Sequence, residues 1–270
     1  MFNIETYLDS LPKDIEEIYI SNKGITLLDV TRFKNLKILN CHYNQLTSLY
    51  LPETLQILYC YYNRLTYLNL PETLQELHCS CNQLTSLQLP ETLKILNCCQ
   101  NQLTSLHLPE MLQLLDCNHN QLTSLNLPET LQTIYCKNNQ LTTLQLNKNL
   151  KHFYCDNNQL TSLHLNENLL MLYCPHNQLT SLHLNENLEF LDCSNNPVYE
   201  ILNTNDELIK KLRVLNQFRY LYYCLKFKKR FRDWLWVKIR EPKIRIKYSH
   251  DYLVANLYED TDLDELLNNW

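Results

Sequence analysis

The residues of this sequence best suited to chemistry are cysteines that recur at one fixed interval. Twelve cysteines are present, and nine of them follow one another at a spacing of 19 residues. These nine are Cys41, Cys60, Cys79, Cys98, Cys117, Cys136, Cys155, Cys174 and Cys193. Thiols spaced so evenly could ligate a metal, pair as disulfides, or pack as small apolar side chains.

Packing is the interpretation that the spacing favours. Structural zinc takes four ligands around one point, whereas one cysteine per repeat places the thiols along a line. Adjacent repeats would bring Cα atoms within disulfide range, but side chains in register point the same way, and a reducing compartment keeps thiols free. We therefore predict a structural role for the nine cysteines, with no metal site and no cofactor. Cys81 and Cys99 lie outside the series at positions expected to be exposed, and we expect these two thiols to react more readily.

The cysteines belong to a repeated unit that reads L-x-x-L-x-C-x-x-N-x-L-T-x-L-x-L-P-E-T. Nine clear copies follow a degenerate copy that begins at Ile15, and the period is 19 residues. This pattern predicts a solenoid of ten units over residues 15–202, preceded by an N-terminal cap, residues 1–14. Residues 203–270 are expected to form a helical, basic-aromatic segment with an acidic tail.

Each position of the unit has a predicted place in one coil of the solenoid. The L-x-x-L-x-C part alternates near its end, so its apolar side chains face inward and the residues between them face outward. The asparagine follows at a turn, where its side chain can bond backbone groups of the turn and of the next coil. These structural asparagines are Asn44, Asn63, Asn82, Asn101, Asn120, Asn139, Asn158, Asn177 and Asn196.

The second half of the unit is expected to return along the opposite wall of the coil. Nineteen residues leave no room for a strand, two turns and a helix, so this return segment should be extended. The prolines of the P-E-T positions, from Pro52 to Pro128, fit an extended segment better than a helix. Units from Leu131 onward replace P-E-T by N-K-N or N-E-N, which indicates two blocks of duplication.

The unit resembles a leucine-rich repeat. The stretch L-x-L-P-E-T-L-Q resembles the short, proline-containing subtype of bacterial effector proteins. The recurring C-N-Q-L-T-S-L makes the whole chain similar to leucine-rich repeat proteins of giant amoebal viruses of the mimivirus type, although cysteine stands here where leucine is usual in the family. The resemblance implies an α/β-type leucine-rich repeat solenoid that is mostly β, with a parallel sheet on its concave face, extended return segments and a C-terminal helical cap.

The outward side chains of such a sheet form the surface that a partner would contact. Two groups are candidate partner-binding residues. The first is Ile38, Ile57, Tyr43, Tyr59, Tyr61 and Tyr62, and the second is Tyr135, Tyr154, Tyr173, His152, Met171 and Phe190. Tyrosine suits protein interfaces, although aromatic and β-branched residues also favour strands for their own sake. Because folding does not require solvent-facing isoleucine, methionine and phenylalanine, we predict a protein-binding face.

The sequence shows no constellation typical of an enzyme. We find no serine–histidine–acid or cysteine–histidine set, and the single glycine, Gly24, argues against a glycine-rich phosphate loop. His107, His164 and His183 lie between leucines of the return wall and are expected to face solvent. We therefore predict no catalytic residues, and a non-enzymatic scaffold that binds a protein, expected to be a host protein, through its concave tyrosine-rich face.

A link to host ubiquitination is one alternative, because bacterial relatives of the short repeat can carry a ubiquitin ligase domain. Such a domain needs a nucleophilic cysteine and more chain than the 68 residues of the segment 203–270. Cys224 lies in the apolar stretch YLYYCLKF, which would raise the pKa of its thiol. This alternative is therefore an adaptor or effector without a catalytic domain of its own.

The C-terminal part differs from the rest of the chain in charge. The whole chain has a net charge of -5, whereas residues 207–247 carry fourteen Lys or Arg against three acids. Thr204 and Glu207 form a capping box that starts a stretch with helical spacing. Basic and aromatic residues alternate in residues 226–247 and could contact nucleic acid or an anionic membrane. A cap helix with buried aromatics is the other interpretation, and we favour it.

The N-terminal stretch and the cysteine content bear on location. The stretch MFNIETYLDSLPKDIEE has neither the basic start nor the apolar core of a secretory signal, and no apolar run is long enough to span a bilayer. Twelve cysteines in 270 residues is well below the density of a secreted disulfide scaffold. We expect an intracellular protein, monomeric and located in the host cytoplasm.

Overall fold

The computed structural model describes residues 2–182, 184–185 and 187–199. The chain divides into two units, Met1–Asp206 and Glu207–Trp270, and all of the described residues belong to the first unit. The predicted C-terminal segment, residues 203–270, lies outside the described residues. The predictions made for the capping box, for residues 226–247 and for Cys224 lie outside them as well.

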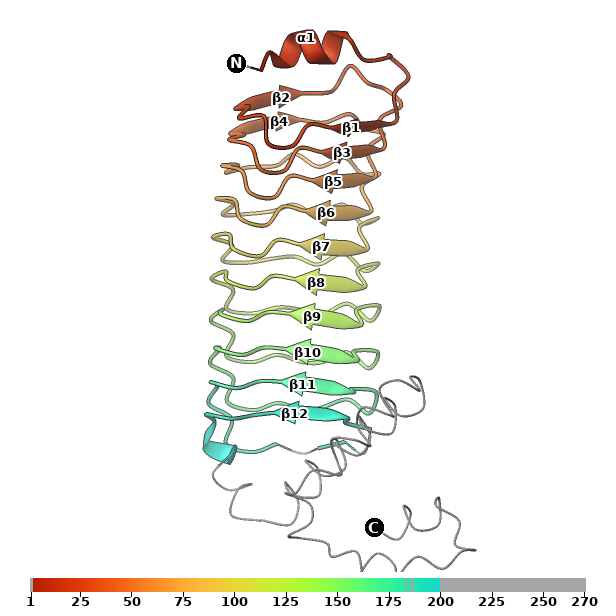
Figure 1. Cartoon of the computed structure of the whole chain (residues 1–270). Helices are drawn as coiled ribbons and strands as arrows, with labels where there is room; N and C mark the ends of the chain where they lie inside the picture. Colours follow the sequence, from red (N-terminus) through yellow and green to blue (C-terminus); the bar gives the residue numbers. More distant parts are fainter. Residues whose placement is uncertain (1, 183, 186, 200–270) are drawn as a thin grey trace, which may run out of the picture. The chain divides into compact units, whose positions relative to one another are not determined.

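Ten short strands form one parallel sheet, because each L-x-x-L-x-C stretch places an inward apolar residue between two outward residues. In sheet order the strands are β1 (Glu17–Tyr19), β3 (Ile38–Asn40), β5 (Ile57–Tyr59), β6 (Glu76–His78), β7 (Ile95–Asn97), β8 (Leu114–Asp116), β9 (Thr133–Tyr135), β10 (His152–Tyr154), β11 (Met171–Tyr173) and β12 (Phe190–Asp192). They follow one another as successive rungs in Figure 1. The predicted parallel β-solenoid is confirmed.

The register of the sheet repeats the period of the sequence. From β3 onward, residues 19 positions apart lie side by side on neighbouring strands, as Ile57 lies beside Glu76. Between β1 and β3 the offset is 21 positions, because the first unit has two extra residues. The cysteine after each strand extends the pairing, and Cys60 N donates to His78 O at 2.8 Å. Equivalent side chains of successive units therefore form straight columns across the sheet.

The return segments form the second wall of the solenoid. Near the N-terminus two of them contain regular strands, β2 (Leu27–Asp29) and β4 (Ser48–Tyr50), which pair in parallel. In the described residues from 51 to 182 the return segments contain no helix, as the short period predicted. Leucines of both walls, such as Leu55 and Leu65, are fully buried, so the core lies between the two walls.

The short helix α1 (Ile4–Asp9) lies at the N-terminal end of this stack (Figure 1). Asn3 caps the helix, because its Oδ1 accepts a hydrogen bond from Thr6 N at 3.1 Å. Leu8 is 2% exposed and joins the core. Such a cover shields the leucines that an open solenoid end would expose. Across the described part of the chain, no helix has the length and apolar character needed to cross a membrane.

The turn that closes each coil has two sequence versions, and in both versions the side chain at the third position donates a hydrogen bond to the backbone of the preceding coil. In a P-E-T coil, Thr73 Oγ1 donates to the carbonyls of Glu53 and Leu55, both at 2.7 Å. In the later coils an asparagine replaces the threonine, and Asn149 Nδ2 donates to Glu129 O at 2.8 Å. Either side chain satisfies a backbone carbonyl of the preceding coil, so both sequence versions close the coil in the same way.

Candidate functional site

The nine cysteines of the series form a buried column behind the sheet. Eight of them are 0% exposed and Cys193 is 4% exposed, and all nine are free thiols. Burial raises the pKa of the Cys193 thiol to about 12 and raises that of Cys117 well above its usual value. Such thiols carry almost no thiolate at neutral pH. No group of three metal-ligating side chains occurs among the described residues.

The asparagines after each strand form a second internal column, the asparagine ladder. Asn63 Nδ2 donates to Cys60 O at 2.9 Å and to Cys41 O at 3.2 Å, and its Oδ1 accepts from Leu46 N at 2.9 Å. Cys41 and Leu46 belong to the preceding coil, so the bonds lead backward along the chain. The sequence had predicted bonds to the next coil, and in that respect the prediction was wrong.

We define the strand face as the first and third residue of each strand of the ten-stranded sheet, together with the second and third residues after it. The N-terminal patch is the first predicted group, joined in the structure by His42: Ile38, His42, Tyr43, Ile57, Tyr59, Tyr61 and Tyr62. The rings of Tyr43 and Tyr62 stack with centroids 4.5 Å apart, and those of His42 and Tyr61 stack at the same separation. Tyr43 is 51% and Tyr62 47% exposed.

The backbone at Tyr43 and Tyr62 is left-handed, with φ of 52° and 53°. Every coil has a residue in this conformation directly before its ladder asparagine, or before the equivalent residue of the first coil. Asparagine tolerates the left-handed region better than other residues with a side chain, and it occupies this position in four coils, as Asn22, Asn138, Asn157 and Asn195. A tyrosine here carries backbone strain and exposes an aromatic ring.

Two polar atoms, one within the N-terminal patch and one next to it, lack hydrogen-bond partners among the described residues. They are Asn40 Oδ1 and His42 Nδ1, and both are buried. Burial also lowers the pKa of the His42 imidazole, which favours its neutral form. A buried polar atom without a partner costs about 1–3 kcal/mol, so these two atoms do not stabilise the fold.

The C-terminal patch is the second predicted group, and its centre is a row of three tyrosines. The rings of Tyr135 and Tyr154 stack with centroids 4.6 Å apart and an interplanar angle of 11°, and Tyr173 follows at 6.4 Å from Tyr154. Tyr154 Oη lies 3.7 Å from Met171 Sδ. Phe190 is 40% exposed beside Tyr173. The structure thus places four side chains of this group, Tyr135, Tyr154, Tyr173 and Phe190, in one continuous aromatic row.

Solved structures resemble this chain, although no protein-family model and no curated protein matches the sequence. The functional domain of InlJ from Listeria monocytogenes, described as including a cysteine ladder, is 33% identical with a TM-score of 0.64. The match covers 67% of this chain and 44% of that one. This chain is a leucine-rich repeat solenoid.

Two further solved structures extend the comparison. YopM from Yersinia enterocolitica is 30% identical with a TM-score of 0.60, and the match covers 70% of this chain and 48% of YopM. A leucine-rich repeat protein of Leptospira interrogans is 28% identical with a TM-score of 0.58, covering 68% and 56%. The leucine-rich repeat chain therefore spans about half the length of the structures it matches. The predicted resemblance to bacterial leucine-rich repeat proteins is confirmed.

The two cysteines outside the column differ from what the sequence predicted. Cys81 and Cys99 are half-buried rather than exposed. Cys81 Sγ lies 2.6 Å from Gln100 Oε1, and burial raises the pKa of the Cys99 thiol to about 11. The predicted exposure is therefore wrong, whereas the predicted difference in reactivity from the column stays a prediction, because burial raises the pKa of the Cys193 thiol of the column further, to about 12.

One histidine–carboxylate pair lies on the strand face. His78 Nε2 lies 2.8 Å from Glu76 Oε1, which also accepts a hydrogen bond from Tyr59 Oη at 2.9 Å. Burial and this carboxylate raise the pKa of Tyr59 to about 12, so its hydroxyl stays protonated. None of the hydrogen bonds of this cluster reaches a serine or a cysteine, so it has a structural arrangement rather than that of a catalytic triad.

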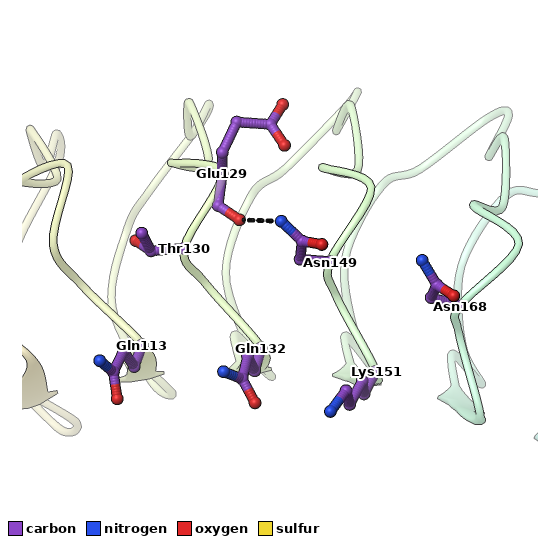
Figure 2. A pocket seen from close by; sticks show the side chains of 7 residues that line it. All are labelled: Gln113, Glu129, Thr130, Gln132, Asn149, Lys151 and Asn168. Carbon is purple, nitrogen blue, oxygen red and sulfur yellow. Dashed lines mark hydrogen bonds between the residues drawn. The ribbon is translucent and has the colours of Figure 1, made fainter.

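A polar hollow of about 420 Å³ lies where the leucine-rich repeats turn from the return wall into strands β8 to β11. Its lining residues, shown in Figure 2, are Gln113, Glu129, Thr130, Gln132, Asn149, Lys151 and Asn168. Amide side chains dominate the lining, and Asn149 is engaged with the Glu129 carbonyl. The hollow contains no histidine or cysteine and no pair of carboxylates, which are the groups that acid–base or nucleophilic catalysis uses.

The strand face of the leucine-rich repeats is acidic. Its carboxylates are Glu17, Glu76, Asp116, Asp156 and Asp192, and its one lysine is Lys137. Lys137 Nζ lies 2.9 Å from Asp156 Oδ2, so this cation is already paired. The aromatic patches are therefore surrounded by negative rather than positive charge, which opposes contact with phosphate groups.

Proposed function

We propose that this protein is a non-enzymatic scaffold that binds another protein through the two aromatic patches of its strand face. The similar solved structures, bacterial leucine-rich repeat proteins among them, support an interaction scaffold in general terms. Stacked repeats provide extended surfaces in which frame and contact residues occupy different positions. Here cysteine and asparagine columns form the frame, while the outward residues vary from coil to coil.

The observation that carries the proposal is the exposed pair Tyr43 and Tyr62. Both occupy left-handed backbone where four other coils hold asparagine, and both are about half exposed. The stacked rings contribute about 1 kcal/mol, and a bulky residue in this conformation costs about the same or more. Folding therefore gains little from them, whereas aromatic anchors gain substantially when a partner covers them.

A host protein is the partner class that we propose, on the resemblance of the repeats to viral proteins. Affinity capture from an amoebal lysate, with the full chain as bait, tests this. The variant Tyr43→Asn with Tyr62→Asn should reduce the captured partner about tenfold or more, because it removes two aromatic anchors. A second bait with Tyr154→Asn and Tyr173→Asn tests the C-terminal patch.

A matched control uses two tyrosines on the return wall that are at least as exposed as Tyr43 and Tyr62. Tyr50 is 53% and Tyr67 62% exposed, and the variant Tyr50→Asn with Tyr67→Asn should capture the partner as well as the parent chain does. Capture that survives both strand-face variants, or that is lost only with the return-wall variant, would contradict the proposal.

A further inference from the structure

Within the strand face, one column has a carboxylate at each end and tyrosines between. The third residues of strands β8 to β12 lie in register across the sheet in the order Asp116, Tyr135, Tyr154, Tyr173 and Asp192. We call this column the tyrosine strip. It combines apolar ring surface with negative charge at two fixed points.

The two carboxylates of the strip differ from the other acids of the strand face. Those other acids have side-chain partners, namely Tyr19 for Glu17, Tyr59 and His78 for Glu76, and Lys137 for Asp156. Among the residues that the structure describes, Asp116 Oδ1 accepts only from Asn118 N at 3.1 Å, and Asp192 Oδ1 only from Ser194 N at 3.0 Å. Within the described residues, the Oδ2 atoms of both have neither a hydrogen bond nor a salt bridge, although the imidazoles of His78 and His119 lie near enough to Asp116 to act on the pKa of its carboxyl by lowering it.

Partial burial makes this lack of a partner significant for Asp116. Burial raises the pKa of its carboxyl above the usual value, because the charged form loses hydration. An arriving cation compensates a desolvated carboxylate more effectively than a fully hydrated one. The guanidinium of arginine suits this position, since it pairs with a carboxylate through two hydrogen bonds and packs on aromatic rings.

The spacing of the strip defines the ligand further. Asp116 and Asp192 are four coils apart, which is roughly 19 Å at a strand spacing of about 4.8 Å. An extended peptide advances about 3.3 Å per residue, so about six residues cover this distance. Because six is even, residues i and i+6 of such a peptide point to the same side, as do residues i+2 and i+4 between them.

We propose that the tyrosine strip binds an extended segment of a partner protein with basic residues at positions i and i+6 and apolar residues at i+2 and i+4. The basic residues pair with Asp116 and Asp192, and the apolar residues pack on the three tyrosines. This inference rests on the proposed function, and it adds the chemistry and spacing that the partner segment must have.

Fluorescence anisotropy with labelled synthetic peptides and the full chain tests the proposal. One peptide carries arginines six positions apart with leucines at the two intervening same-side positions. A second has the arginines five positions apart, and a third has glutamates in their place. At low ionic strength we expect the first to bind about tenfold more tightly than the second, and the third not to bind. Equal affinities of the first two peptides would contradict the predicted spacing of six positions between the basic residues.

A conservative double variant tests the two carboxylates. The double variant Asp116→Asn with Asp192→Asn removes both charges. It should keep the turn, because an asparagine already makes the same bond in another coil: Asn97 Oδ1 accepts from Cys99 N at 3.2 Å. We expect each substitution to lower the affinity for the first peptide about tenfold. The control Glu110→Gln with Glu129→Gln also removes two charges, but from the turns that precede β8 and β9 rather than from the strand face. It should leave the affinity for the first peptide unchanged. Unchanged affinity in the aspartate variant would overturn the proposal.

The other possible occupant is a segment of this chain. Residues 232–238 read R-D-W-L-W-V-K, with Arg232 and Lys238 six positions apart and Trp234 and Trp236 between them. The full chain with Arg232→Ala and Lys238→Ala should bind the first peptide as the parent does. Tighter binding of the first peptide by this variant would identify the chain's own segment as the occupant. It would overturn the proposal that a segment of a partner protein occupies the strip.

The two proposals fail separately. If capture of a host protein depends on the tyrosines but no peptide binds, the proposed scaffold function stands. The proposed segment with basic residues at i and i+6 is then wrong. Peptide binding to the strip, together with capture that no strand-face variant reduces, removes the proposed scaffold function but keeps the ligand chemistry.

Discussion

At the scale of single residues, Tyr43 and Tyr62 show how the strand face departs from what folding alone would select. Both side chains lie on left-handed backbone, with φ of 52° and 53°, and both expose about half of their surface. Four other coils place asparagine at the same position. A fold can tolerate such local strain, but it gains nothing from it, so strained and exposed residues are candidates for contact with a partner.

Replacing both tyrosines by asparagine should therefore leave the fold almost as stable as before. Relief of roughly 1 kcal/mol of strain at each position offsets about 1 kcal/mol lost with the exposed ring stack. We expect a urea midpoint equal to or above that of the parent chain. Tyr154→Asn, at an extended strand position, is the comparison and should lower the midpoint, because asparagine disfavours strands. A larger decrease in the double variant than in Tyr154→Asn would mark the pair as structural.

At the scale of one coil, the asparagine ladder joins each unit to the preceding one. Asn120 Oδ1 accepts from Leu103 N at 3.0 Å, and its Nδ2 donates to Cys98 O and Cys117 O, both at 3.1 Å. These backbone groups are buried, so they have no access to water as a substitute partner. One side chain therefore satisfies backbone atoms of two coils.

Asn120→Ala should lower the free energy of unfolding by about 3 kcal/mol, because it leaves buried donors and acceptors without partners. Urea unfolding followed by circular dichroism measures the change. Gln121→Ala is the matched control, since Gln121 is exposed and adjacent in sequence, and it should shift stability by less than about 0.5 kcal/mol. Similar effects of the two substitutions would mean that the ladder contributes little to stability.

Much of the fold could be predicted from the sequence, because the repeat fixes the register of every strand at once. Alternation within L-x-x-L-x-C gave the inward cysteine column, and the short period excluded helices from the return wall. The direction of the ladder bonds was predicted wrongly, since Asn63 could reach either neighbouring coil and sequence spacing does not distinguish them. Cys99 was predicted to be exposed because cover from neighbouring coils depends on side-chain packing that the unit pattern does not contain.

The candidate site was accessible to sequence reasoning only in part. The aromatic residues of both patches could be chosen from their columns, and the structure brings their rings together. The left-handed backbone at Tyr43 was not recognised, although the recurrence of asparagine in that column was a signal for it. The carboxylates Asp116 and Asp192 stood in the same column as the tyrosines, but the absence of a salt bridge to either of them within the described residues depends on side-chain contacts that only the structure gives.

At the scale of the whole solenoid, each coil touches little beyond its immediate neighbours. The ten strands pair only with the strands before and after them, so stability is close to a sum of coil and neighbour terms. A defect at one end should therefore loosen that end and leave distant coils protected. The patches are also separated along this axis, at β3 to β5 and at β9 to β12, so loss of one need not distort the other.

Leu8→Ala tests this locality at the N-terminal end. Leu8 of α1 is 2% exposed and belongs to the core, so its truncation should cost the adjacent coils about 2 kcal/mol. In hydrogen exchange we expect faster exchange of amides in β1 and β3, with β9 to β11 unchanged. The matched variant Leu172→Ala, in the fully buried middle of β11, should reverse the pattern. Uniform loss of protection in either variant would show that the solenoid opens as one cooperative unit, in which case a partner bound at one patch would stabilise the other.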